Sequence, residues 1–151
     1  MKAEDAAKKV LDTMLGHLGF AASVDLEHDD EGPCLQITTA QPELLIGEDG
    51  DRLDDLQYLV NRLIRKHYED APRVKVDCGH FRSMHEEKLK EEVRGIAEKV
   101  KSSQKPFHMR PLNAYYRRLV YQAVLDDPQI EVHSPDGAAR LKRITLSLKA
   151  N

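Results

Sequence analysis

The sequence predicts an α+β protein made of two small units joined by a helix. Apolar residues recur at helical spacing in some segments and alternate with polar residues in others, with Gly and Pro clusters between them. The charge is also unequally divided. Residues 1–80 carry 9 Lys and Arg against 17 Asp and Glu, a net charge of −8, whereas residues 81–151 carry 14 against 9, a net charge of +5. The second half therefore favours an anionic partner.

The first unit is predicted over residues 1–80, with the order helix, strand, strand, short helix, turn, helix, strand. Gly19 is positioned to end the first helix, and the DDEGP segment provides a turn between the first two strands. The apolar positions expected to face the core in the second long helix are Leu53, Leu56, Val60, Leu63 and Ile64. The expected elements are a helix over 3–18, strands over 24–28 and 35–39, a short helix after Pro42, a helix over 51–67 and a strand over 73–78.

The GEDG turn, residues 47–50, stands between the two helices of this unit. Its glycines permit a sharp turn and a close approach by a partner, and the following helix N-terminus favours a phosphate. The carboxylates of Glu48 and Asp49 oppose the same ligand. An alternative interpretation is a plain helix entry, with Asp49 or Asp51 as the N-cap.

A connecting helix is predicted over 81–103. Ser83 and Glu86 have the spacing of a capping box at its start, and the charged pairs Glu86–Lys90 and Glu91–Arg94 indicate a largely solvated helix that joins two domains. The second unit is predicted over 104–151. Its expected elements are an extended piece over 107–110, a helix over 113–126 and strands over 130–133 and 140–149.

Several classes of protein are disfavoured by the sequence. No apolar run approaches the roughly 20 residues of a membrane span, and the charged N-terminus is unlike a signal peptide, so a cytoplasmic location without membrane insertion is expected. Cys34 and Cys78 are expected to be reduced and packed. Cys78, His80 and His85 lack a fourth metal ligand at suitable spacing. With no catalytic motif, we expect a non-enzymatic protein without metal or cofactor.

Several segments resemble the bacterial Jag family, whose members are also called KhpB or EloR. The segments LLIGEDGDRLDDLQYLVN and VDCGHFR look like its KH domain, and MRPLNAYYRRLVYQAVLDDP with SPDGAARLKRI resembles its R-three-H domain. The resemblance covers nearly the whole chain except for the family's additional N-terminal domain, so a short form is expected. It implies a type II KH domain (α-β-β-α-GxxG-α-β) joined by a helix to a small α/β R-three-H domain.

The resemblance also implies binding of single-stranded RNA, or of single-stranded DNA, in post-transcriptional or cell-envelope and cell-shape regulation. A KH GxxG turn clamps about four nucleotides. The R-three-H name refers to an arginine and a histidine three residues apart, which are Arg117 and, in the histidine position, Tyr121; Tyr116 takes a position usually acidic. The implied contact residues are Gly47, Glu48, Asp49, Gly50 and Arg52 in the KH turn, and Arg110, Arg117, Arg118, Tyr121, Arg140, Lys142 and Arg143 in the C-terminal unit.

Two functional hypotheses follow. In the first, the C-terminal arginines attract the phosphates, Tyr115, Tyr116 or Tyr121 stacks on bases, and the GEDG turn contributes backbone contacts. In the second, the acidic KH surface is a docking or dimerisation module for a second copy or another KH protein, and RNA is secondary.

Overall fold

The computed structural model describes residues 1–150 and divides the chain into two compact units, the first spanning Met1–Ser83 and the second beginning at Met84. With this boundary the first unit has 10 Lys and Arg against 17 Asp and Glu, a net charge of −7, and the remaining residues have 13 against 9, a net charge of +4. The charge asymmetry inferred from the sequence is therefore a difference between two folded units.

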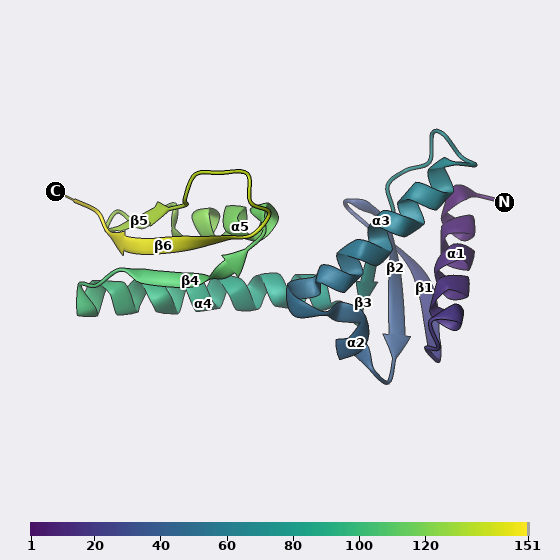
Figure 1. Cartoon of the computed structure of the whole chain (residues 1–151), viewed down its shortest axis with the longest axis horizontal. Coiled ribbons are helices and arrows are strands. Elements are labelled where there is room, and N and C mark those ends of the chain that lie inside the picture. The colour runs from purple at the N-terminus through teal and green to yellow at the C-terminus, as the bar shows by residue number, and fades with distance from the viewer. Residues whose placement is uncertain (151) are drawn as a thin grey trace. The chain divides into compact units, whose positions relative to one another are not determined.

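The first unit has the predicted order of elements (Figure 1). In chain order they are α1 (Ala3–His17), β1 (Ala22–Asp29), β2 (Gly32–Thr39), α2 (Pro42–Ile46), the 3₁₀ turn η1 (Glu48–Gly50), α3 (Asp51–Arg65) and β3 (Lys75–Cys78). Gly19 adopts a φ of 87° and follows the last turn of α1, where Phe20 N–H donates to the Leu15 carbonyl at 2.9 Å. The predicted glycine stop is confirmed, because glycine adopts this conformation without steric cost.

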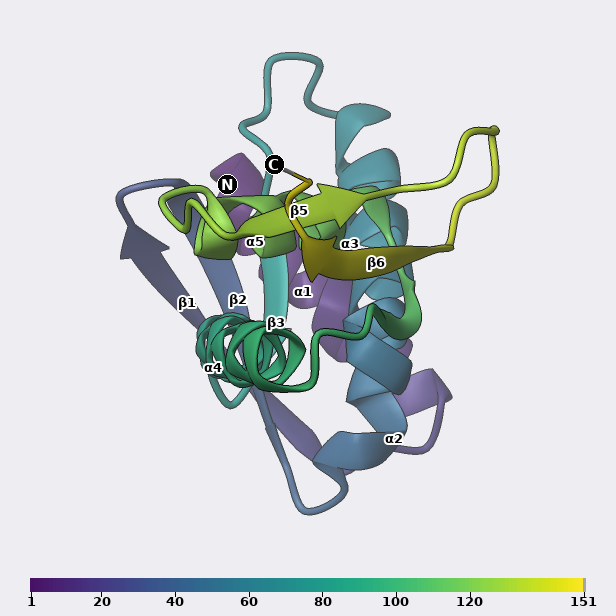
Figure 2. The same ribbon diagram turned by 90° about the vertical axis from the view of Figure 1, so that its left-hand side faces the viewer.

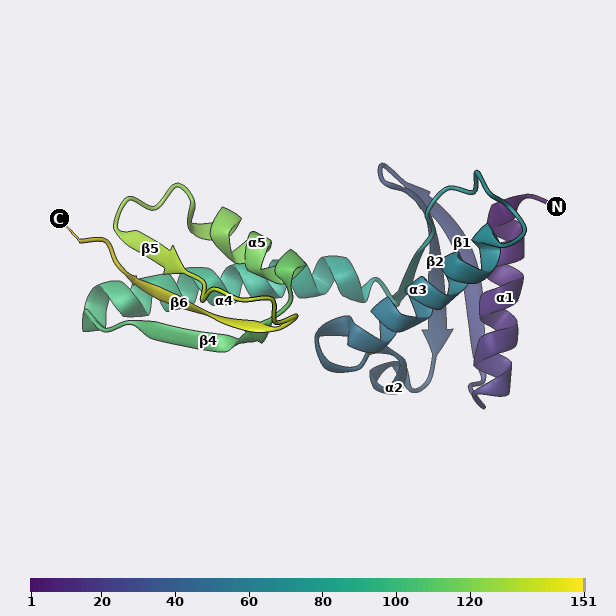
Figure 3. The same cartoon turned by 45° about the horizontal axis from the view of Figure 1, so that its top comes forward.

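The sheet of the first unit has the strand order β1-β2-β3, with β1 and β2 antiparallel and β2 and β3 parallel. Helices α1 and α3 contact each other and cover one face of the sheet (Figures 1 and 3). Leu35, Ile37 and Val76 are fully buried between the helices and the sheet. The expected inward position of Leu63 is wrong: its exposed fraction is 42%, because it lies beside the buried stripe of α3 rather than on it.

The second unit packs two helices against an antiparallel sheet with the strand order β4-β6-β5. Figure 2, which looks along α4, shows α4 and α5 on the same side of this sheet. The elements are α4 (Phe81–Ser103), which begins in the last residues of the first unit, β4 (Phe107–Leu112), α5 (Ala114–Val124), β5 (Ile130–His133) and β6 (Lys142–Leu148). The apolar stripe of α4 belongs to this core, with Leu89, Val93 and Val100 buried. The helix is thus a packed layer of the second unit.

The start of α4 differs from the prediction. The helix begins at Phe81, and Ser83 lies inside its first turn, where the Ser83 hydroxyl donates to the His80 carbonyl. The buried carboxylate of Asp77 instead accepts a hydrogen bond from the Arg82 backbone N–H at 3.2 Å. The capping-box prediction is therefore wrong, because a side chain from the preceding strand satisfies an N-terminal amide of the helix.

Both cysteines are free and buried, as predicted. The register pairs Cys34 with Lys75 and Ile37 with Cys78, so the two thiols lie three positions apart on neighbouring strands and face opposite sides of the sheet. Burial, followed by the charge of Asp77, raises the pKa of the Cys34 thiol to about 11 and raises the pKa of the Cys78 thiol as well. Thiols so shifted are poor nucleophiles and metal ligands near neutral pH.

Candidate nucleic-acid interface

The GEDG turn is a strained connection that only this pattern of glycines allows. Gly47 has a φ of 72°, and a Cβ there would lie 2.1 Å from Asp51 Oδ1 and 2.8 Å from Arg52 Cγ. Asp49 and Gly50 follow with φ values of 52° and 81°. Gly50 is buried and occupies the N-cap position of α3, and no side chain caps the helix. The alternative in which Asp49 or Asp51 is the cap is therefore wrong.

The surroundings of the turn are acidic. Glu48 is exposed, and the first turn of α3 adds Asp51 and Asp54. The cation predicted for this site, Arg52, directs its guanidinium to the backbone, where Nη1 donates to the Leu44 carbonyl at 2.8 Å. The structure thus brings the five predicted turn residues together, but it uses the arginine to brace α3 against α2.

The C-terminal prediction centres on α5, where Arg117, Arg118 and Tyr121 line one surface groove of about 350 Å³. Residues three and four apart lie on the same side of a helix, which brings Arg117 and Tyr121 together. Arg118 is exposed, and 40% of Tyr121 is exposed. The other lining residues are Ala114, Gln122 and Leu125. The groove combines a cationic side, a phenol ring and an apolar floor.

Arg117 has a structural task in addition to its place in the groove. It is half-buried, and its Nη1 donates to the Leu112 carbonyl at 2.5 Å and to the Arg140 carbonyl at 3.4 Å. These contacts connect α5 to the end of β4 and to the segment before β6. They also place the backbone of exposed Arg140 beside the groove.

Two of the predicted cations do not join this groove. Arg143 faces away from the helices, because it pairs with exposed Pro111, whereas the adjacent Lys142 pairs with buried Leu112 on the helix-covered face. Arg110 binds Glu92 on α4, with Nη1 at 2.8 and 2.9 Å from the two carboxylate oxygens. The predicted basic cluster is thus divided between two faces and one ion pair.

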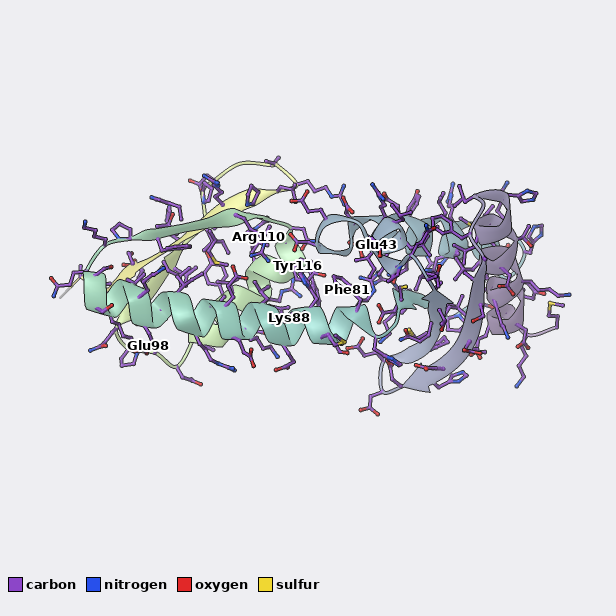
Figure 4. All side chains as sticks on the ribbon, turned by 90° about the horizontal axis from the view of Figure 1, so that it is seen from below. Glu43, Phe81, Lys88, Glu98, Arg110 and Tyr116 are labelled. Atoms are coloured by element: carbon purple, nitrogen blue, oxygen red, sulfur yellow. The ribbon has the colours of Figure 1, made fainter. Side chains whose placement is uncertain are left out.

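The tyrosines are also divided. Figure 4 labels Tyr116 and Arg110, which both lie beside α4. Tyr116 is only 3% exposed and makes edge-to-face contacts with His85 and Tyr115, so it is a core residue and is unsuited to stack on a base. Tyr115 is half exposed and its hydroxyl donates to Glu86. Tyr121 remains the tyrosine that lines the groove.

The structure adds residues that the sequence interpretation missed. Gln122 and Leu125 complete the groove, and their helical spacing from Arg118 and Tyr121 was a usable signal. On β4, His108 Nδ1 lies 2.8 Å from Thr145 Oγ1 of β6. Nothing in the local sequence indicates this pairing, because it depends on the register of two strands that are distant in the chain.

Residues 1–150 contain neither a metal cluster nor a membrane helix. No group of three or more His, Cys, Asp or Glu side chains in that range is placed to hold a metal ion. None of the helices in that range is long and apolar enough to cross a membrane.

Comparison with known proteins places the C-terminal unit in a recognised class: residues 87–147 match the model of the R-three-H domain, as the resemblance of α5 and the following turn implied. That segment includes α5 and most of α4. The chain as a whole is similar to proteins named "RNA-binding protein KhpB". It is 29% identical to the one from Clostridium symbiosum over 148 residues, and 23% identical to the one from Lactiplantibacillus plantarum over 134 residues. These alignments cover 97% and 87% of this chain, but 66% and 42% of the respective relatives.

Proposed function

We propose that the chain is a non-enzymatic, cytoplasmic regulatory protein that binds single-stranded RNA mainly through its C-terminal unit. The observation that carries the proposal is the α5 groove, in which Arg117, Arg118 and Tyr121 lie on one surface. The match to the R-three-H domain and the names of the two relatives support a nucleic-acid ligand. The positive net charge of this unit favours the same ligand over a cationic or neutral one.

The groove offers two kinds of contact to a single strand. The exposed guanidinium of Arg118 can form a bidentate pair with a phosphate, and Arg140 and Lys142 add positive charge nearby. The ring of Tyr121 can stack on a base, and its hydroxyl can donate to a phosphate. Tyrosine in the usual histidine position therefore exchanges a potential cation for a stacking surface.

We assign the first unit to a type II KH domain on its order of elements and on its Gly-x-x-Gly turn between two helices. In this proposal the turn contributes backbone contacts only. Each carboxylate within several Å of a phosphate opposes binding by roughly 1 kcal/mol or more at surface-like dielectric. Glu48 and Asp49 would thus weaken the contribution of the turn, and the main phosphate contacts move to the C-terminal unit.

The test is a salt titration of the affinity of the full chain for a single-stranded RNA. Four neutralised phosphates predict a slope of log K against log salt of about −3. Substituting Arg118→Ala and Arg140→Ala together is expected to lower affinity and to make the slope shallower by about 1.4. The matched control is Arg94→Ala with Lys99→Ala, two exposed cations of α4. Equal slopes for the two double variants would count against the groove.

A second candidate function is self-association through α3. Its outer side carries exposed Tyr58, Leu59 and Leu63, which lie between an acidic first turn and a last turn containing Arg62 and Arg65. A groove of about 210 Å³ lined by Leu44, Leu56 and Leu59 adjoins this stripe. Two copies with antiparallel α3 helices would bury the apolar stripe and place each acidic end against the partner's basic end.

Analytical ultracentrifugation over a range of protein concentrations tests this candidate. Leu59→Asp is expected to shift a dimer to monomer, because it places a charge in the apolar stripe. Leu141→Asp, at an exposed leucine outside this surface, is the control. If the unmodified chain sediments as a monomer throughout, the second candidate is rejected and the RNA-binding proposal is unaffected.

A further inference from the structure

The sheet of the second unit has one face that neither α4 nor α5 covers. The side chains that pack on the helices are Met109, Leu112, Ile130, Ile144 and Leu146. The positions that alternate with them point the other way, and the row contains exposed His108, His133, Arg143 and Glu131, with half-buried Thr145 and Ser147. Figure 3 shows the three strands of this sheet with the helices of the unit.

A row of three residues crosses this face. His108 of β4 pairs with Thr145 of β6, and Thr145 pairs with His133 of β5. The His108 Nδ1 to Thr145 Oγ1 hydrogen bond of 2.8 Å fixes the orientation of one imidazole ring. Because neighbouring strands lie about 4.8 Å apart, the two histidine backbones are separated by about 10 Å. Each ring can therefore contact a different group of one ligand.

The chemistry around the row favours a single-stranded nucleic acid over a protein. Arg143 lies two residues from Thr145 on the same face, about 7 Å along the strand, and can reach a phosphate. On β5 and β6 the outward positions are His133, Glu131, Arg143, Thr145 and Ser147, so these strands offer no aliphatic anchor of the kind that protein interfaces require. Glu131 lies opposite Ser147, at the other end of the row from Arg143, and restricts the phosphates to the Arg143 end.

We propose that this sheet face is a second contact surface for single-stranded RNA, on which His108 and His133 each stack with one unpaired base while Arg143 binds an adjacent phosphate. Flat sheets that present ring side chains hold single strands in this way, and histidine is among the rings that stack on bases. The inference rests on the proposed RNA-binding function and extends it from the α5 groove to the opposite face of the same unit. It also gives the isolated position of Arg143 a role.

The experiment measures binding of the full chain to a labelled 12-nucleotide RNA and to the same backbone made abasic at every position. His108→Ala with His133→Ala is expected to weaken binding of the RNA about tenfold and to leave the abasic strand unaffected, because stacking is lost and the phosphates are unchanged. His108→Phe with His133→Phe keeps two rings and is expected to retain the affinity. His17→Ala with His67→Ala, two exposed histidines of the first unit, is the matched control. Thermal unfolding of each variant confirms that it folds.

Two outcomes would overturn the inference alone. One is an unchanged RNA affinity in the alanine pair while Arg118→Ala still weakens binding; the other is an equal loss for RNA and abasic strand. A wild-type chain that binds neither strand would overturn both this inference and the proposed function. An NMR titration adds an independent readout, since the ring signals of His108 and His133 are expected to shift with RNA and those of His67 to remain in place.

Discussion

At the scale of single residues, Arg117 and Arg118 are neighbours on α5 with different roles. Arg117 donates to the carbonyls of Leu112 and Arg140, whereas Arg118 is exposed. Arg117→Ala is expected to lower the free energy of unfolding by about 1–3 kcal/mol, because acceptors of a charged donor lose their partner. Arg118→Ala is expected to leave stability within about 0.5 kcal/mol and to weaken RNA binding. Urea unfolding and an RNA titration on both variants separate the roles, and similar destabilisation by both would contradict this assignment.

Gly47 is the position where the KH turn depends on the absence of a side chain. Gly47→Ala places a Cβ against Asp51 and Arg52 at a positive φ, and is expected to destabilise the chain by about 1–3 kcal/mol. A Cβ added at Gly16 in α1 would meet no heavy atom within 4 Å, and the φ there is ordinary, so Gly16→Ala is expected to be neutral or stabilising. Chemical denaturation measures both, and equal effects would show that the turn is not strained.

The carboxylates of the GEDG turn distinguish the two functional hypotheses. Glu48→Gln with Asp49→Asn removes both charges, and Asn tolerates the positive φ at residue 49. If the turn lies near RNA, affinity for RNA is expected to rise roughly fivefold or more at low salt. If the acidic surface docks a protein, RNA affinity stays constant and the association state changes. Asp5→Asn with Asp12→Asn, on the exposed side of α1, is the charge-matched control.

At the scale of elements, an ion pair joins the last turn of α4 to the segment between α5 and β5. Lys101 Nζ lies 2.6 Å from Asp127 Oδ2, and this hydrogen bond holds the pKa of Asp127 below its ordinary value. The stabilisation is therefore present above the ordinary aspartate pKa, near 3.9, and is lost as the pH falls through the lowered native pKa. Asp127→Asn keeps the acceptor for the Gln129 N–H and removes the charge.

The expected result is that Asp127→Asn is less stable than wild type at pH 7 and equal to it near pH 2. Urea unfolding at several pH values measures the gap, with Asp126→Asn, at the exposed adjacent position, as the control. A gap that persists unchanged at pH 2 would mean that the effect comes from packing and not from charge.

The order of elements could be predicted because periodicity and glycine positions are local signals. Gly19 at the end of α1 and Asn113, whose side chain caps α5 by accepting from Tyr116 N–H, lie next to the helices they delimit. The start of α4 could not be predicted, because Asp77 reaches it from the preceding strand. Local sequence carries no signal for a contact that the tertiary fold creates.

The candidate site was predicted in part for the same reason. Arg117 and Tyr121 share a helix side, which their spacing shows directly. The alternation of β6 could have separated Lys142 from Arg143, but only with the strand boundaries known. The pairing of Arg110 with Glu92, 18 residues earlier on α4, required the fold.

At the scale of the whole molecule, the two units carry different charges and, in our proposal, different tasks. The acidic first unit presents a tightly built turn and an exposed apolar helix side, and the basic second unit presents the α5 groove and an open sheet face. An anionic strand is attracted to the second unit and repelled from the first. The central claim is that the second unit supplies the main RNA contacts.

Ultraviolet crosslinking of the full chain to a single-stranded RNA, with mapping of the crosslinked peptides by mass spectrometry, tests that claim most directly. We expect crosslinks concentrated in the unit that begins at Met84, with peptides of α5 among them. Crosslinks confined to the GEDG turn and the adjoining residues of α2 and α3 would contradict it.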